Sequence, residues 1–88
     1  MVEETDWEQA VRKEAHRYFE VLVREKARKT TLPMSQCREF AFDWLTLQTG
    51  KRIDSIEDLL LVDLYTVIAV CKPHAEKISN LNGHQKQK

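Results

Sequence analysis

Glycine and proline together supply only four of the 88 residues, and this scarcity constrains the fold more than any other feature of the sequence. Average usage would give about ten, since glycine and proline make up roughly 12% of typical chains. A small sandwich or barrel needs several tight hairpin turns, and the favoured turns demand residues such as glycine at positive φ. The scarcity therefore predicts an all-α fold built from a few long helices.

The first helix is expected over residues 6–29. Thr5, followed three positions later by Glu8, matches a capping box, in which each side chain binds the other residue's backbone N–H. Apolar residues then recur at helical spacing along one side, and basic residues gather at the end, where they complement the helix dipole. The segment is therefore predicted to be one amphipathic helix.

The second helix is expected over residues 34–49, between a proline and a glycine. Pro33 suits the first turn of a helix, and Gly50 stands where a left-handed residue commonly ends one. One broad apolar face is predicted to enter the core: Met34, Cys37, Phe40, Ala41, Trp44, Leu45 and Leu47. Phe42 points away from that face, and we expect its ring to be partly exposed.

A third helix is expected over residues 55–72. Asp54 or Ser55 would cap it, because either is followed three positions later by an acidic residue. Pro73 should end it, since the residue before a proline disfavours helical backbone. A weaker helical pattern covers residues 74–81.

A chain of 88 residues allows one domain, which we place over residues 1–81. Residues 82–88 are polar and are expected to form a disordered tail. The predicted fold is a small all-α antiparallel bundle of three helices, or of four if the weaker segment folds separately.

The third predicted helix carries more apolar surface than its neighbours can cover. Its apolar side chains spread over nearly the whole circumference, and a helix of that kind is normally buried on all sides. Leaving several leucine-sized side chains in water would forgo roughly 1.5–3 kcal/mol each. Either the segment after Pro73 folds back over them or a second copy of the chain covers them, and we expect a homodimer. The predicted interaction surface comprises Phe42, Leu61, Val62 and Tyr65.

Asp63 lies at the centre of the apolar arc of the third helix. A buried carboxylate must find a partner or hold its proton, because an unpaired buried charge costs several kcal/mol. A functional interpretation makes it a perturbed acid in a pocket. The favoured interpretation is structural: a buried polar residue that accepts from Trp7 or Trp44, from a tyrosine hydroxyl, or from an arginine such as Arg38.

Four basic residues on one side of the first helix form a candidate basic patch: Lys13, Arg17, Arg24 and Arg28. Such a patch attracts phosphates, so a nucleic-acid-associated regulator is the alternative function. However, 14 basic and 14 acidic residues cancel, and Glu20 can pair with Arg24 at i, i+4. Glu25 can pair with Lys29 in the same way, and a salt-bridged helix surface is the favoured interpretation. A helix-turn-helix is excluded, because its recognition helix would be apolar and begin with acids.

Cys37 and Cys71 are too few for a disulfide framework, and both fall on predicted core faces. We expect two buried thiols that act as small hydrophobic side chains. With His74 they would supply three zinc ligands, but the sequence has no C-x-x-C and marks no fourth ligand. No metal and no cofactor are expected.

The sequence carries no glycine-rich phosphate loop, no G-x-S-x-G and no H-E-x-x-H, so we expect no catalytic residues and no enzyme activity. His16 has Glu20 four positions on, which predicts a surface pair. The acidic N-terminus resembles no secretory signal and no apolar run could span a bilayer, so a cytoplasmic protein without a membrane partner is expected. We therefore expect a helical protein–protein interaction module, such as an adaptor, small subunit or regulator, with a protein partner that the sequence does not identify.

Overall fold

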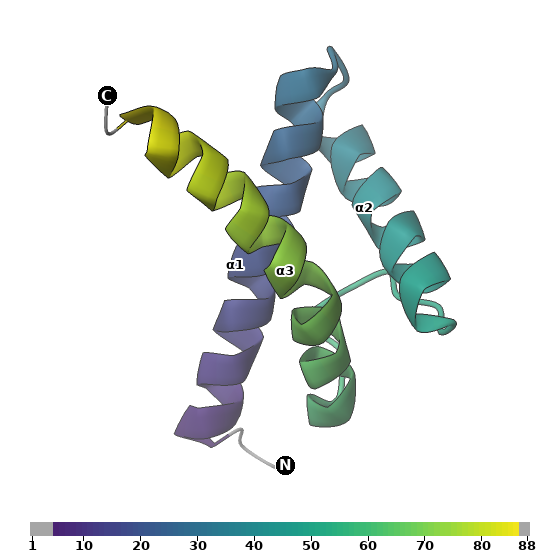
Figure 1. Cartoon of the computed structure of the whole chain (residues 1–88). Coiled ribbons are helices and arrows are strands. Elements are labelled where there is room, and N and C mark those ends of the chain that lie inside the picture. The colour runs from purple at the N-terminus through teal and green to yellow at the C-terminus, as the bar shows by residue number, and fades with distance from the viewer. Residues whose placement is uncertain (1–4, 87–88) are drawn as a thin grey trace.

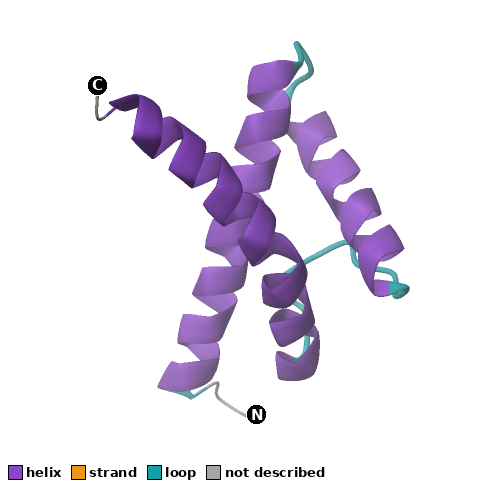
Figure 2. Ribbon diagram, in the orientation of Figure 1, coloured by secondary structure: helices purple, strands orange, loops and turns teal. Residues whose placement is uncertain are grey.

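The computed structural model describes the backbone of residues 5–86 and the side chains of residues 5–80. This part of the chain forms three helices and no strand (Figure 2). They are α1 (Asp6–Lys29), α2 (Met34–Thr49) and α3 (Leu61–Lys86). The all-α prediction is confirmed, and within the described residues no helix is long and apolar enough to cross a membrane.

The predicted bounds of the first two helices are confirmed, and a local capping contact fixes one end of each. The Glu8 N–H donates to Thr5 Oγ1 at 3.1 Å, and the Thr5 N–H donates to Glu8 Oε1 at 3.2 Å, which completes the capping box. At the end of α2, Gly50 adopts a φ of 70°, and its N–H donates to the Thr46 carbonyl at 2.9 Å. A left-handed residue of this kind ends a helix at little cost when it is glycine.

The expected start of the third helix at residue 55 is wrong, because α3 begins at Leu61. Its predicted first turn belongs instead to a loop that connects α2 to α3, residues 50–60. In this loop Ile53 and Ile56 are buried in the core. The Thr46 hydroxyl accepts from the Ile53 N–H at 3.0 Å, which holds the start of the loop against α2.

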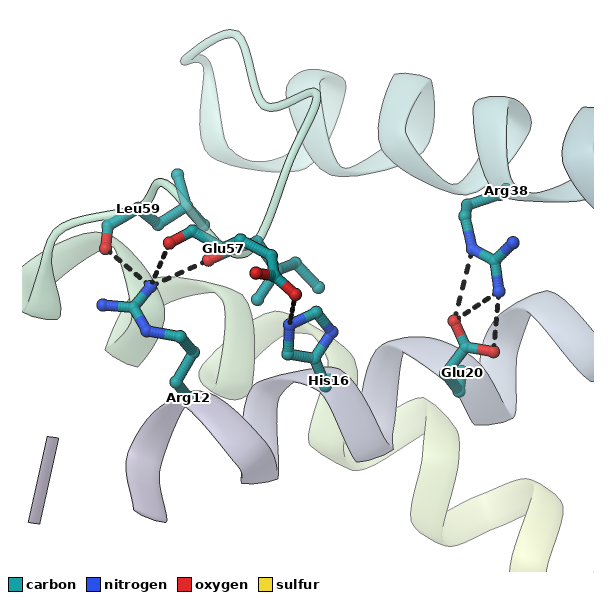
Figure 3. A network of polar contacts seen from close by, with 7 residues as sticks. Arg12, His16, Glu20, Arg38, Glu57 and Leu59 are labelled. Atoms are coloured by element: carbon teal, nitrogen blue, oxygen red, sulfur yellow. Dashed lines mark hydrogen bonds and ion pairs between the residues drawn. The ribbon is translucent and has the colours of Figure 1, made fainter. Parts of the chain in front are cut away.

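Arg12 of α1 holds the second half of the loop in its non-helical form (Figure 3). Its Nη1 donates to the carbonyl oxygens of Ile56, Glu57 and Leu59 at 2.9, 3.0 and 2.9 Å. Hydrogen bonds from a charged donor are the stronger ones in proteins. In an α-helix, backbone carbonyl oxygens accept hydrogen bonds from N–H groups of the same helix. Here they accept instead from a side chain 44 to 47 positions away in the sequence.

The expected end of the third helix before Pro73 is also wrong, because α3 continues through this proline to Lys86. The separate helix expected over 74–81 is part of α3, and residues 82–86 are helical rather than a disordered tail. Proline cannot donate to the carbonyl four positions earlier. That carbonyl belongs to Ala69, and both residues lie on the exposed side of α3, where water can satisfy it. Residues 87–88 lie outside the described part of the chain.

The helices α1 and α2 lie side by side and run in opposite directions, while α3 crosses α1 (Figure 1). The C-terminal half of α3 then extends away from α2 (Figure 1). The largest side chains of the core are fully buried between these elements: Phe19, Val23, Cys37, Leu45, Ile56, Leu64, Val67 and Cys71. The core therefore lies between all three helices and the loop, and the outward side of α2 stays uncovered.

Candidate interaction surface

Large apolar side chains remain exposed at several places in the described chain: Trp7, Met34, Phe40, Leu47, Leu60, Val62 and Tyr65. They fall into two groups. One group lies around the beginnings of α1 and α3, and the other lies along α2. Single exposed apolar residues are ordinary, whereas neighbouring ones mark candidate binding surfaces.

The first group contains an exposed aromatic pair that joins α1 to α3. The rings of Trp7 and Tyr65 lie 5.8 Å apart between centroids, tilted by 51°. They are 59% and 43% exposed, and Val62, three positions before Tyr65 on the same side of α3, is 66% exposed. We call Trp7, Val62 and Tyr65 the α3 patch.

The predicted interaction surface is only partly present as expected. Val62 and Tyr65 are exposed, while Leu61 is half-buried and packs against the core. Phe42, predicted to point away from the core, is half-buried as well, because its ring stacks on Phe19 at 4.4 Å with an interplanar angle of 28°. Sequence analysis missed the contribution of Trp7, since only the crossing of α3 over α1 brings it beside Tyr65.

Asp63 sits in the first turn of α3 and forms an ion pair rather than entering a buried pocket. Lys51 Nζ donates to its two carboxylate oxygens at 2.9 and 3.0 Å. The partner is neither an indole, nor a tyrosine, nor Arg38, all of which the sequence suggested. Because an acidic residue is favoured near a helix N-terminus, this contact both stabilises the start of α3 and anchors the preceding loop.

Two further ion pairs differ from those expected along α1 (Figure 3). Glu20 binds Arg38 of α2, with the guanidinium Nη2 at 2.8 and 2.9 Å from its two oxygens, and does not pair with Arg24. His16 Nε2 lies 3.7 Å from Glu57 Oε1 in the loop and does not pair with Glu20. Both contacts are long-range, so they join α1 to the rest of the fold instead of stabilising α1 alone.

The candidate basic patch is exposed along α1: Lys13, Arg17, Arg24 and Arg28. Glutamates neutralise two of its members. Arg17 lies 3.5 Å from Glu14, and Arg28 donates to both oxygens of Glu25 at 3.0 and 2.7 Å. The hydrogen bond from Arg28 lowers the pKa of Glu25, which also forms the predicted pair with Lys29 at 3.4 Å.

Cys37 and Cys71 are buried free thiols, as the sequence suggests. Burial raises the pKa of Cys71 to about 12, so its thiol stays protonated at physiological pH. His74 does not join them, because it lies edge-on to Trp44 with ring centroids 5.1 Å apart. Across the described residues, no three His, Cys, Asp or Glu side chains are grouped to hold a metal ion.

No protein-family model, no curated protein and no solved structure matches this chain. The function of the protein therefore has to be inferred from its own exposed side chains. Among these, the α3 patch combines two aromatic rings with a branched aliphatic side chain on two packed helices. Aromatic side chains of this kind are enriched at protein interfaces.

Proposed function

We propose that the protein is a non-enzymatic interaction module that forms a homodimer through the α3 patch. The exposed Trp7–Tyr65 pair is the observation that carries this proposal. Tryptophan and tyrosine are enriched among the residues that dominate binding energy at protein interfaces. The helices on which they stand are packed against each other, so the pair is held in place before any partner arrives.

Charge does not oppose dimerisation. The chain has equal numbers of acidic and basic residues, so two copies experience no net repulsion. Asp63, next to Val62 in the sequence, is already paired with Lys51. The Asp63 carboxylate would thus stay paired if the patch were covered, and burying an unpaired charge is the costly event at an interface.

The alternative function, a nucleic-acid-associated regulator that uses the basic patch on α1, has less support. Lys13 and Arg24 form no ion pair with another described residue, but Arg17 and Arg28 are engaged by glutamates. Nucleic-acid affinity depends on the number of phosphates that a surface neutralises. Two cations of the basic patch without an ion pair, together with a net charge of zero, give little of that affinity.

The proposal predicts that Tyr65→Glu converts the protein from a dimer to a monomer. A charge at the centre of the patch should weaken association at least about thirtyfold, the effect of losing roughly 2 kcal/mol or more at a binding hot spot. Tyr65 is not part of the buried core, so the variant should keep its helical circular dichroism. Sedimentation equilibrium at micromolar concentration gives the mass of each protein.

Gln9→Glu is the matched control, because it adds the same charge to an exposed position of α1 two residues from Trp7 and on another side of the helix. It should leave the dimer intact. A wild-type protein with the mass of one chain would refute the homodimer. Equal loss of the dimer in both variants would refute its location at the α3 patch.

A further inference from the structure

The second group of exposed apolar residues follows α2 at helical spacing. Phe40, Trp44 and Leu47 stand at i, i+4 and i+7, the pattern with which one helix packs against another. Phe40 is 50% exposed, Leu47 is 80% exposed and Trp44 is half-buried. The sequence places all three in the core, but the core receives Cys37 and Leu45 from α2 and the Phe42 ring stacks on Phe19. Phe40, Trp44 and Leu47, which we call the α2 seam, therefore lie on the outward side of α2.

A hollow lies beside this seam, where α1, α2 and α3 meet. Its volume is about 260 Å³, and Leu22, Cys37, Phe40, Ala41 and Trp44 form its apolar lining. The α3 helix contributes only His74, because its C-terminal half turns away from α2 (Figure 1). We call this hollow, together with Leu47, the α2 groove.

The charged and titratable side chains of the hollow are basic. Lys26 and His74 belong to its lining, and no acidic side chain does. Lys26 Nζ lies 5.2 Å from the centroid of the Phe40 ring, and no carboxylate among the described residues pairs with it. The His74 ring lies nearly perpendicular to the Trp44 ring, with the two centroids 5.1 Å apart. An ammonium group beside an apolar surface is best satisfied by a carboxylate that arrives with the apolar partner.

We infer that the α2 groove docks an acidic amphipathic helix of another protein. Apolar side chains of that helix, at i, i+4 and i+7, would pack on Phe40, Trp44 and Leu47, and a flanking carboxylate would bind Lys26. The occupant has to bring this carboxylate, because no acidic side chain lines the hollow. The groove uses none of the residues of the α3 patch, so the inference extends the proposed interaction role to a second surface.

The test uses two synthetic helical peptides that share leucines at i, i+4 and i+7 and differ only in their flanks, glutamate in one and lysine in the other. In the Trp7→Phe variant, Trp44 is the one remaining tryptophan of the chain, so its emission reports on the groove. The glutamate peptide should produce a saturable change in emission. The lysine peptide should bind at least about tenfold more weakly, because like charges meet at Lys26.

Lys26→Glu should reverse the preference between the two peptides. Lys13→Glu is the matched control on the opposite side of α1 and should change the affinity less than about twofold, since solvent and salt screen distant charges. Absence of saturable binding, equal binding of both peptides, or equal effects of the two lysine variants would overturn the inference. Repeating the titration in the Tyr65→Glu background separates this result from the homodimer, because the groove should bind with or without dimerisation.

Discussion

Replacing Phe19 with alanine is expected to lower the free energy of unfolding by about 3–5 kcal/mol, the usual cost of removing a fully buried phenyl ring. Phe19 lies at the contact between α1 and α2, where its ring stacks on Phe42. The substitution removes apolar burial and leaves a cavity that the two helices can only partly close. Because a domain of this size is stable by only about 5–13 kcal/mol, urea titration should show a large shift of the midpoint.

Two further phenylalanines provide internal controls for that measurement. Phe42→Ala should cost about 2 kcal/mol, because its ring is half-buried against Phe19. Phe40→Ala should cost less than about 1 kcal/mol, because its ring is half exposed on the outer side of α2. The loss of stability should be largest for Phe19→Ala, smaller for Phe42→Ala and smallest for Phe40→Ala. This order shows directly which side of α2 faces the core. A larger loss for Phe40 than for Phe42 would show that α2 presents the opposite face to the core.

Replacing Arg12 with methionine is expected to destabilise the protein by about 2–3 kcal/mol, because hydrogen bonds to charged groups contribute more than neutral ones. The substitution keeps an unbranched apolar stem but removes the donor for three loop carbonyls. Those oxygens would then have to turn toward water. Amide hydrogen exchange should accelerate most between residues 53 and 60, where the guanidinium holds the loop.

Arg24→Met is the control for Arg12→Met, since Arg24 is an exposed arginine on the same helix. Its effect should stay within about 0.5 kcal/mol, as for most surface substitutions. Equal effects of the two substitutions, or unchanged exchange in the loop of Arg12→Met, would contradict the role given to Arg12.

The sequence predicts the extent of the first two helices because one end of each is encoded locally. A capping box at Thr5 and a left-handed glycine at position 50 each act within four residues of the helix end. The start of α3 is different. Asp54 and Ser55 offer valid caps, but Arg12 binds the loop carbonyls from more than 40 positions away, and no local pattern reveals that competition.

The orientation of α2 could not be predicted from its own sequence either. Its apolar residues cover an arc wider than one neighbouring helix can bury, so the pattern permits several rotations. The structure adopts one of these rotations of α2. In it, Glu20 pairs with Arg38 and the Phe42 ring stacks on Phe19. As a result, Phe40 faces outward and Phe42 packs inward, the reverse of the sequence-based expectation.

The excess apolar surface was visible in the sequence, but its distribution was not. Much of the third helix is covered by α1, which buries Leu64, Val67 and Cys71. What stays exposed is divided between the α3 patch and the α2 groove. The one binding surface expected on the third helix is thus replaced by two separate candidates, each built by side chains from more than one helix.

The emission of Trp7 tests the proposed homodimer most directly, because this indole is part of the α3 patch and is 59% exposed in the single chain. In a Trp44→Phe variant, Trp7 is the remaining tryptophan. A second copy that covers the patch should shield Trp7 at high protein concentration and shift its emission to shorter wavelength. Dilution should then return the emission to longer wavelength with the same midpoint as the fall in mass. Emission that stays at long wavelength at every concentration would contradict a dimer built on the α3 patch.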